Sequence, residues 1–334
     1  MKRIILVLLL VYAFSASVNA QCCGGGSGSP IAGGESRGVL MERQMEISSS
    51  FVYLNTDKFL TGNTPDTNFL DNYNSKYEYT RLAYGLSKKF TLSIESGYWI
   101  NKTQIGLHGV DTNDASGFGD LIISPRYNVY NKTKNSWFTE LTLGIGFKIP
   151  LGKYNDSLRR IEPFSGEVYY IPKTLAVQPS SGAQDIIFQL FFFHGHNIKK
   201  LNFIANMLYI KKGWNPLGEK IGDYAGVTFT VSKTYFKRLG LALQLKGEWV
   251  DQMSLNKNIL LYAYPNYDPF ATGYRKVMLA PIASYFIKQG LSVFVMPEIP
   301  VYQYMFKTQI ASKFQVNFGI TYRFFPFKMA PAVE

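Results

Sequence analysis

The sequence predicts an all-β protein: an antiparallel transmembrane β-barrel of about 12 strands, preceded by a cleaved signal peptide. Three observations lead to this fold class. Apolar and polar residues alternate along most of the chain, which is the period of a strand with two different faces. The alternating segments are about a dozen residues long, as membrane-crossing strands must be. Their connections alternate between short and long, which is typical of transmembrane barrels.

Composition excludes several other classes. Of the 334 residues, 46% are hydrophobic and 17% charged, so the chain has enough apolar surface to fold and too few charges for a coiled coil. Its 2 cysteines are adjacent, which excludes a disulfide scaffold. No internal apolar run reaches the ~18 residues that a membrane-spanning helix needs. The net charge of +12 comes largely from lysines in expected turns and loops, so we expect no nucleic-acid partner.

Residues 1–20 have the organisation of a secretory signal peptide. Lys2 and Arg3 precede the apolar run 4–14, and small and polar residues follow up to Ala20. This order of charged, apolar and small residues predicts cleavage after Ala20. The apolar run is too short to cross a bilayer as a helix.

A Gly-rich segment, residues 21–38, follows the expected cleavage site. Cys22 and Cys23 lie at its start, and three interpretations remain open. The first is a flexible leader with two incidental thiols. The second is lipid attachment at Cys22, which Gln21 disfavours as a neighbour of the cleavage site. The third is a metal or redox role, for which no partner His lies nearby.

The alternation is clearest in residues 137–149. There the apolar residues Leu141, Leu143, Ile145 and Phe147 alternate with Thr142, Gly144, Gly146 and Lys148. The same test predicts strands within residues 39–325 near 41–54, 76–87, 89–101, 117–130, 136–149, 183–195, 200–211, 223–234, 238–250, 274–287, 290–303 and 311–325.

Loop lengths give the barrel its orientation. Connections after the even-numbered strands are tight, for example residues 87–88 and 131–135, whereas the longest follow odd-numbered strands, at 55–75, 150–182 and 251–273. Short periplasmic turns and long external loops are the pattern of bacterial outer-membrane barrels. We therefore expect an integral protein of a Gram-negative outer membrane that is assembled by the barrel-assembly machinery. Residues 326–334 form a C-terminal tail.

Aromatic residues on the lipid-facing side are expected near both rims, as in the girdles of membrane barrels. Those near short turns are Tyr84, Trp137, Tyr285 and Tyr322, and those near long loops are Tyr53, Tyr98, Tyr209 and Trp249. We expect them to contact membrane lipid.

The inward-facing positions predict a lumen with two kinds of wall. Charged lumen residues are Glu95, Asp120, Arg126, Glu140, Lys148, Lys246, Glu248, Glu298 and Arg323. Both signs occur, so we expect pairing, because unpaired charge in a narrow interior is costly. Apolar lumen residues are Phe191, Leu208, Met278, Ile282, Phe294 and Met296. A lumen for ions or sugars has no need of such a wall, whereas a path for a small hydrophobic compound does.

Prolines interrupt three of the predicted strands, at Pro125, Pro281 and Pro297. Proline removes a donor from the strand ladder. A tight turn near residues 288–290 sets Pro281 opposite Pro297 in adjacent strands. This pair either only sets the curvature of the barrel or forms a weakened seam, a lateral exit toward the bilayer.

Three short motifs resemble a known family. Gly-Phe-Gly-Asp-Leu at 117–121, followed by Pro-Arg-Tyr at 125–127, is similar to the Gly-x-Gly-Asp strand of the meta-pathway phenol-degradation outer-membrane proteins. The segments 144–152 and 182–185 resemble the next strand and the following strand start. Members of that family usually end on an aromatic residue, whereas here a tail follows Phe325. The resemblance implies a channel similar to the fatty-acid transporters, for small hydrophobic compounds.

We therefore expect an outer-membrane channel for uptake of small hydrophobic solutes. The alternative is a structural or adhesive barrel whose external loops bind a surface partner. No His–Ser spacing suits a barrel phospholipase and no metal-ligand set is complete, so we expect neither catalysis, metal nor cofactor.

Overall fold

The computed structural model describes residues 20–21, 38–67, 70–106, 108, 112–162, 164–173, 177–256 and 271–326. Most of the predicted signal peptide, both cysteines, most of the Gly-rich segment and nearly all of the tail lie outside these residues. Nowhere in the described part is there a helix long and apolar enough to cross a membrane.

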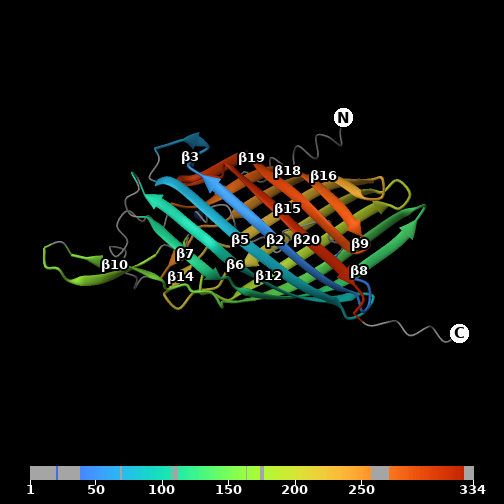
Figure 1. Cartoon of the computed structure of the whole chain (residues 1–334), viewed down its shortest axis with the longest axis horizontal. Coiled ribbons are helices and arrows are strands. Elements are labelled where there is room, and N and C mark those ends of the chain that lie inside the picture. Colours follow the sequence, from blue (N-terminus) through green and yellow to red (C-terminus); the bar gives the residue numbers. More distant parts are fainter. Residues whose placement is uncertain are drawn as a thin grey trace.

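Twelve long strands form a closed antiparallel barrel, which confirms the predicted fold class (Figure 1). Each pairs with its neighbours in chain order, and pairing of the first with the last closes the wall. Every predicted strand corresponds to one of them. They are β2 (Met45–Thr56), β5 (Leu70–Gly85), β6 (Phe90–Gly106), β8 (Leu121–Lys134), β9 (Trp137–Ile149), β12 (Asp185–His196), β13 (Leu201–Lys211), β15 (Tyr224–Tyr235), β16 (Leu239–Val250), β18 (Thr272–Lys288), β19 (Leu291–Ile310) and β20 (Phe314–Phe324).

Short strands gather at the end of the barrel that has the long connections. Among them β10 and β11 form a hairpin that extends beyond the wall (Figure 1). β7 pairs with β6, and β3 pairs with the end of β19. These short strands are β1 (Ala20–Gln21), β3 (Phe59–Gly62), β4 (Thr64–Pro65), β7 (Asn113–Phe118), β10 (Ser157–Ile161), β11 (Val168–Pro172), β14 (Glu219–Lys220) and β17 (Ser254–Leu255).

Several strand limits differ from the prediction. β5 begins at Leu70 and β19 continues to Ile310. The extension of β5, residues 70–75, is mostly polar and has no apolar alternation. That of β19 includes the buried Met305 and Ile310, and a register shift in its pairing with β3 interrupts the alternation. Residues 131–135 were predicted as a turn, which is wrong: β8 continues to Lys134. The turn is Asn135–Ser136, with φ of 49° and 66°. Two positive φ values fit the two-residue turns that match the twist of a hairpin.

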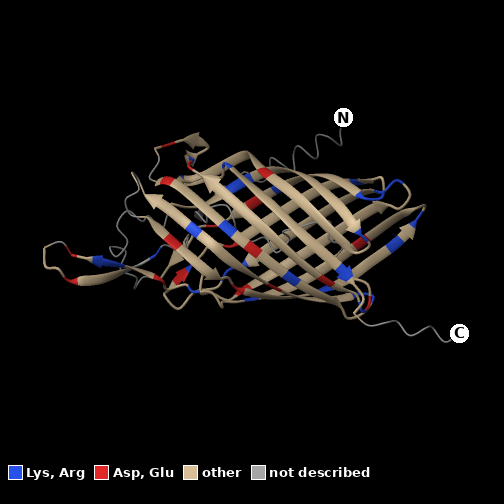
Figure 2. Cartoon of the chain, in the orientation of Figure 1, with Lys and Arg blue, Asp and Glu red and all other residues tan. Residues whose placement is uncertain are grey.

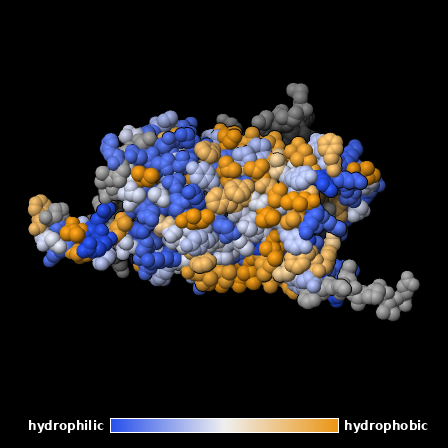
Figure 3. All heavy atoms as spheres, in the orientation of Figure 1, coloured by the Kyte–Doolittle hydropathy of each residue, from blue (hydrophilic) through white to orange (hydrophobic). Residues whose placement is uncertain are grey.

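The outer surface of the wall is apolar. Large side chains along the middle of the strands are exposed, among them Phe188, Phe229 and Leu243, and the intervening residues are buried in the barrel. In Figure 3, hydrophobic residues gather over the wall and hydrophilic residues lie at both ends, most of them at the end with the hairpin. An apolar surface of this extent requires lipid around it. The chain is therefore an integral outer-membrane barrel.

The aromatic residues expected near the rims are half-buried or exposed on outward positions. Trp137 lies at the short-turn end, where its ring stacks on His194 at 4.4 Å between centroids and packs against Phe203 at 6.4 Å. Tyr98, near the long-loop end, contacts Phe118 edge-on at 5.1 Å. Aromatic pairs of this kind suit a membrane–water boundary, where one side of each ring meets lipid.

Candidate functional site: the barrel interior

All of the predicted charged lumen residues lie on inward positions, and the structure joins most of them into separate networks. Figure 2 shows the charged residues spread along the strands rather than confined to the ends. Because successive side chains of a strand point to opposite faces and the outer face meets lipid, the buried charges of the wall point into the lumen. The networks lie on different groups of strands.

The first network lies toward the long-loop end. Lys148 Nζ contacts Asp120 Oδ2 at 2.8 Å and Asp185 Oδ2 at 3.0 Å, and it donates to Ser181 Oγ at 2.7 Å. Lys212 also contacts Asp185 Oδ2 at 3.0 Å. Because β8, β9 and β12 are neighbours, their ends bring these side chains together.

This first network gives the three sequence motifs a common structural role. Each motif supplies one of its charges: Asp120 comes from the first, Lys148 from the second and Asp185 from the third. Gly119, beside Asp120, donates its backbone N–H to the carbonyl of Gly97 at 2.8 Å. The motifs therefore build one buried ion network at the mouth of the lumen.

The second network is centred on Glu46, which sequence reasoning did not select. Its carboxylate accepts a hydrogen bond from Arg81 and another from Arg323 Nε at 2.5 Å. Glu46 and Arg323 are direct cross-strand partners on β2 and β20. Glu46 shares its strand face with Ser48 and Ser50, so the alternation of β2 could have placed it in the lumen. Arg81 and Asp185 lie on faces that also carry apolar residues, which gave no such signal.

The third network lies on β15, β16 and β19. Lys246 Nζ contacts Glu248 Oε1 at 2.8 Å and Glu298 Oε2 at 3.3 Å. Tyr224 donates its hydroxyl to Glu248 Oε1 at 3.1 Å. The Lys246 ammonium group therefore contacts both carboxylates, and Lys276 is a second cation near Glu248.

The remaining predicted charges are Glu95, Glu140 and Arg126. Glu95 accepts hydrogen bonds from the hydroxyls of Tyr79 and Ser93. Glu140 is 5% exposed and accepts from Thr142 Oγ1 at 3.3 Å. Arg126 is buried and lies over the ring of Phe191, with 5.5 Å from its guanidinium carbon to the ring centroid.

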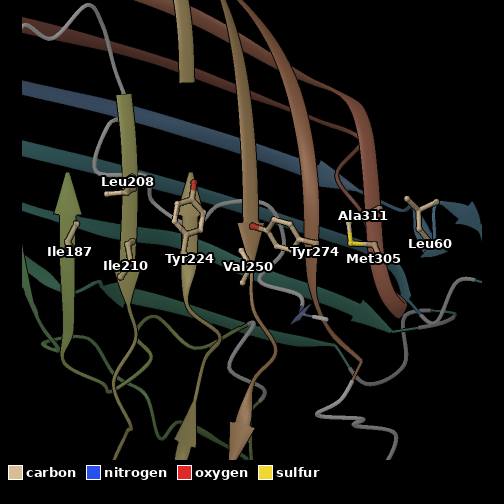
Figure 4. Close-up of a cluster of buried hydrophobic side chains, with 9 residues drawn as sticks. All are labelled: Leu60, Ile187, Leu208, Ile210, Tyr224, Val250, Tyr274, Met305 and Ala311. Atoms are coloured by element: carbon tan, nitrogen blue, oxygen red, sulfur yellow. The ribbon is translucent and has the colours of Figure 1, made fainter. Parts of the chain in front are cut away.

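The apolar wall faces the same lumen. Figure 4 shows one buried cluster from adjacent strands; its members are Leu60, Ile187, Leu208, Ile210, Tyr224, Val250, Tyr274, Met305 and Ala311. A second cluster joins Ala280, Phe294 and Met296, with Ile282 packed against it. Of the other predicted apolar residues, Phe191 and Met278 are buried on the inner face.

The two facing prolines coincide with a gap in the ladder. β18 and β19 pair at Leu279–Ile299 and again at Ala283–Val295, and no pair joins them between these positions in this fully described stretch. The register is the same on both sides, which places Pro281 opposite Pro297. Pro125 coincides with a similar gap, because β8 and β9 pair at Ile123–Phe147 and next at Arg126–Gly144.

Residues before β2 enter the barrel at the short-turn end. Leu40 is buried and donates its backbone N–H to Thr91 Oγ1 at 2.8 Å. Gly38 lies so close to Thr142 that a Cβ at Gly38 would be 2.2 Å from the Thr142 Cβ. Residues 38–40 therefore occupy part of the lumen beside β6 and β9. Nearly all of the Gly-rich segment before them lies outside the described residues.

One absence concerns chemistry. Within the described part of the chain, no group of three or more His, Cys, Asp or Glu side chains could hold a metal ion. His194, on the outer face, accepts or donates a hydrogen bond with Thr139 Oγ1 at 2.8 Å. The contacts described for the three lumen networks are ion pairs and hydrogen bonds.

Comparison with solved structures relates this barrel to outer-membrane channels. It is similar to an outer membrane channel from Pseudomonas putida F1, with a TM-score of 0.63 and 13% identity over 87% of this chain and 99% of that chain. A Pseudomonas aeruginosa FadL homologue is more distant, with a TM-score of 0.44 and 9% identity over 92% of this chain and 98% of that chain. The KdgM porin has a TM-score of 0.40 and 9% identity over 83% of this chain and 99% of that chain. No family model matches the chain, and no curated protein matches it. The first likeness shows a shared barrel fold.

Proposed function

We propose that this barrel is an outer-membrane channel for uptake of small hydrophobic compounds. The observation that supports it most is the buried apolar cluster on the inner wall, which extends from Ile187 on β12 to Met305 on β19. Sites for small hydrophobic molecules are lined mainly by apolar side chains with a few polar groups among them. The channel from Pseudomonas putida F1 is a barrel of similar fold, which is consistent with transport.

The solute class follows from the chemistry of the wall. Tyr224 and Tyr274 contribute rings to the cluster, and Met305 contributes a polarisable thioether (Figure 4). Such surfaces accommodate flat aromatic or short aliphatic bodies of several shapes. The resemblance to phenol-degradation proteins suggests monoaromatic compounds in particular.

We further propose a lateral exit between β18 and β19. The side chains of Pro281 and Pro297 lie on outward positions, and the second apolar cluster lies directly behind them on the lumen face. Without pairing at this point, the two strands separate at a lower energetic cost than where the ladder is complete. A hydrophobic solute that reaches Phe294 and Met296 could then pass into the bilayer without entering water. The competing interpretation is that the prolines only set barrel curvature.

Uptake by whole cells tests the channel. The chain would be expressed in Gram-negative cells that lack comparable channels, because their lipopolysaccharide layer slows hydrophobic solutes. We expect radiolabelled naphthalene to accumulate with a higher initial rate than in cells that carry the empty vector. Equal initial rates, with correctly assembled barrel in the membrane, would contradict the proposed function.

The same assay tests the exit. We expect Pro281→Val with Pro297→Val to restore strand pairing and to lower the initial rate of naphthalene uptake severalfold. Pro125→Val is the matched control, since it removes a proline from another ladder gap and should leave the rate unchanged. If the double variant takes up naphthalene like the wild type, the prolines set curvature alone.

One observation favours the second candidate, an adhesive barrel. The β10–β11 hairpin has exposed apolar residues: Phe164 is 98% exposed, Tyr170 65% and Ile161 54%. A projecting apolar tip suits contact with a surface partner. Replacing residues 157–172 by a short Gly-Ser link would abolish cell adhesion without affecting naphthalene uptake if adhesion is the function of this hairpin. Unchanged adhesion would exclude that role.

A further inference from the structure

Arg126 is a buried cation that has no anionic partner among the residues that the structure describes. Its side chain projects from β8 into the lumen, and the residue is 4% exposed. Among the residues that the structure describes, no carboxylate forms an ion pair with it, and its Nε has no hydrogen-bond partner. Every other guanidinium of the described lumen wall contacts a carboxylate: Arg81 and Arg323 both contact Glu46.

The charges near Arg126 are already engaged. Through space, the charges of Glu95 and Glu46 stabilise the charged guanidinium of Arg126, and the charge of Arg81 destabilises it. However, the two oxygens of Glu95 accept from Tyr79 and Ser93, and Glu46 holds two other arginines. A guanidinium removed from water is costly unless an opposite charge or full hydrogen bonding compensates it. The position is therefore suited to an anion that comes from outside the chain.

Gly144 allows Arg126 to reach across the neighbouring strand. Arg126 pairs with Gly144 on β9, which pairs in turn with Gln189 on β12. A Cβ at Gly144 would be 2.9 Å from Arg126 Cγ and 2.8 Å from Gln189 Oε1. The two side chains therefore approach each other over the bare backbone of Gly144.

These surroundings offer further donors beside an apolar wall. Gln189 Oε1 accepts from Ser124 Oγ at 2.9 Å, and the Gln189 amide nitrogen donates to no group in the described residues. The Phe191 ring lies 5.5 Å from the guanidinium carbon. Ile187 is on the same face of β12, two residues before Gln189, and belongs to the first apolar cluster. Cationic and amide donors thus lie where the apolar wall begins.

We propose that Arg126 and Gln189 bind the carboxylate of a small organic acid whose apolar body lies against Phe191 and Ile187. The fork of a guanidinium matches two carboxylate oxygens, and such charge-assisted bonds are the strongest that side chains form. This inference rests on the proposed function and names a solute class for the same lumen: apolar monocarboxylates, with benzoate as the simplest aromatic member.

Binding of benzoate tests the site. The purified full-length protein in a non-ionic detergent would be dialysed to equilibrium against radiolabelled benzoate at neutral pH. We expect saturable binding that is about 10- to 100-fold weaker in Arg126→Gln, which is the range for loss of a charged hydrogen bond. Benzamide, which lacks the charge, and acetate, which lacks the apolar body, should each compete at least about tenfold less well than benzoate.

Matched variants keep the test decisive. Arg238→Gln removes an arginine from an exposed turn outside the lumen and should bind benzoate like the wild type. If Arg126→Gln fails to assemble, Gln189→Leu takes its place in the test. This variant retains the Arg126 cation but lacks the amide donor, and it should bind benzoate severalfold more weakly than the wild type. Equal affinity in the wild type and these lumen variants, or no saturable binding in the wild type, would overturn the site.

The outcomes also separate the site from the proposed function. Wild-type naphthalene uptake reports the channel, because naphthalene has no charge for Arg126 to bind. Uptake of naphthalene without Arg126-dependent benzoate binding overturns the acid site and leaves the channel. Arg126-dependent binding of benzoate without naphthalene uptake supports the site and contradicts a channel for neutral hydrocarbons.

Discussion

At the level of single residues, the lumen wall is organised by charges that serve two partners each. Lys148 compensates Asp120 and Asp185, Lys246 contacts two glutamates, and Glu46 compensates two arginines. Buried ions need both opposite charge and hydrogen bonds to offset their desolvation. Sharing a partner meets this need with fewer side chains, which leaves wall area for apolar residues.

Lys148→Met should destabilise the barrel. The ammonium group is the only ion-pair partner of Asp120 in the described part of the chain, so its loss leaves a half-buried carboxylate without an opposite charge. We expect the free energy of unfolding to fall by about 3–5 kcal/mol, measured by urea unfolding in lipid vesicles.

Two further variants identify the cause of that loss. Lys153→Met removes a loop lysine that is 64% exposed and pairs with Asp156, and it should change stability by only about 0–1 kcal/mol. Adding Asp120→Asn to Lys148→Met should recover part of the loss. If all three variants have the stability of the wild type, the first network contributes nothing to folding.

The lumen-facing residues could be predicted from the sequence, but most of their ion-pair partners could not. Period-two alternation assigns a face to each position, so Glu298 and Arg323 could be placed in the lumen without a structure. Partners depend on strand register and on side-chain reach. Arg126 shows the limit: an expected pairing does not occur within the described residues, because nearby carboxylates are engaged elsewhere and Gly144 lets its side chain extend toward Phe191.

At the level of elements, the external loops are held by polar contacts that the strand pattern does not reveal. At the base of the β10–β11 hairpin, Asp156 contacts Lys153 and Lys173, each at 2.7 Å. Gln178 Nε2 donates to the backbone oxygen of Asp156 at 2.9 Å and to that of Lys173 at 3.1 Å. Residues 150–182 were predicted as a loop, because the short strands β10 and β11 outside the membrane have no clear alternation of apolar and polar residues.

Acid should loosen this hairpin. Hydrogen bonds from Lys153 and Lys173 hold the pKa of Asp156 below its ordinary value of 3.8. A lowered pKa in the folded state means that the carboxylate stabilises the fold above pH 3.8, and that this contribution is lost as the pH falls below that value. Hydrogen exchange, corrected for intrinsic rates, should show the hairpin protected at about pH 5 and less protected at about pH 3.

Asp156→Asn should abolish that dependence. The variant should show weak hairpin protection at both pH values, whereas Glu167→Gln, which removes a carboxylate on the same loop that has no ion pair in the described residues, should behave as the wild type. Equal protection of the wild type at both pH values would mean that Asp156 does not hold the hairpin.

At the level of the whole molecule, the fold follows from the environments on the two sides of one sheet. Lipid selects apolar residues outside, and the lumen selects a mixture inside, so alternation survives wherever the wall lies in the bilayer. This explains why all of the long strands could be predicted, and why their extensions beyond the bilayer could not. The extension of β5 is mostly polar, and the extension of β19 has a register shift and packs Met305 and Ile310 in buried clusters, so neither shows the alternation that lipid imposes.

The cost of a charge on the outer wall should therefore depend on its depth. Leu243, near the middle of β16, is 53% exposed, and Leu239 begins the same strand beside a short turn. We expect Leu243→Arg to lower the free energy of unfolding in lipid vesicles by about 2–4 kcal/mol, and Leu239→Arg by about 0–1 kcal/mol. At the rim the arginine side chain can reach the head groups, whereas at mid-depth it cannot. If both substitutions cost the same, the outer wall does not lie in a bilayer, and the barrel would have to cover that apolar surface in some other way.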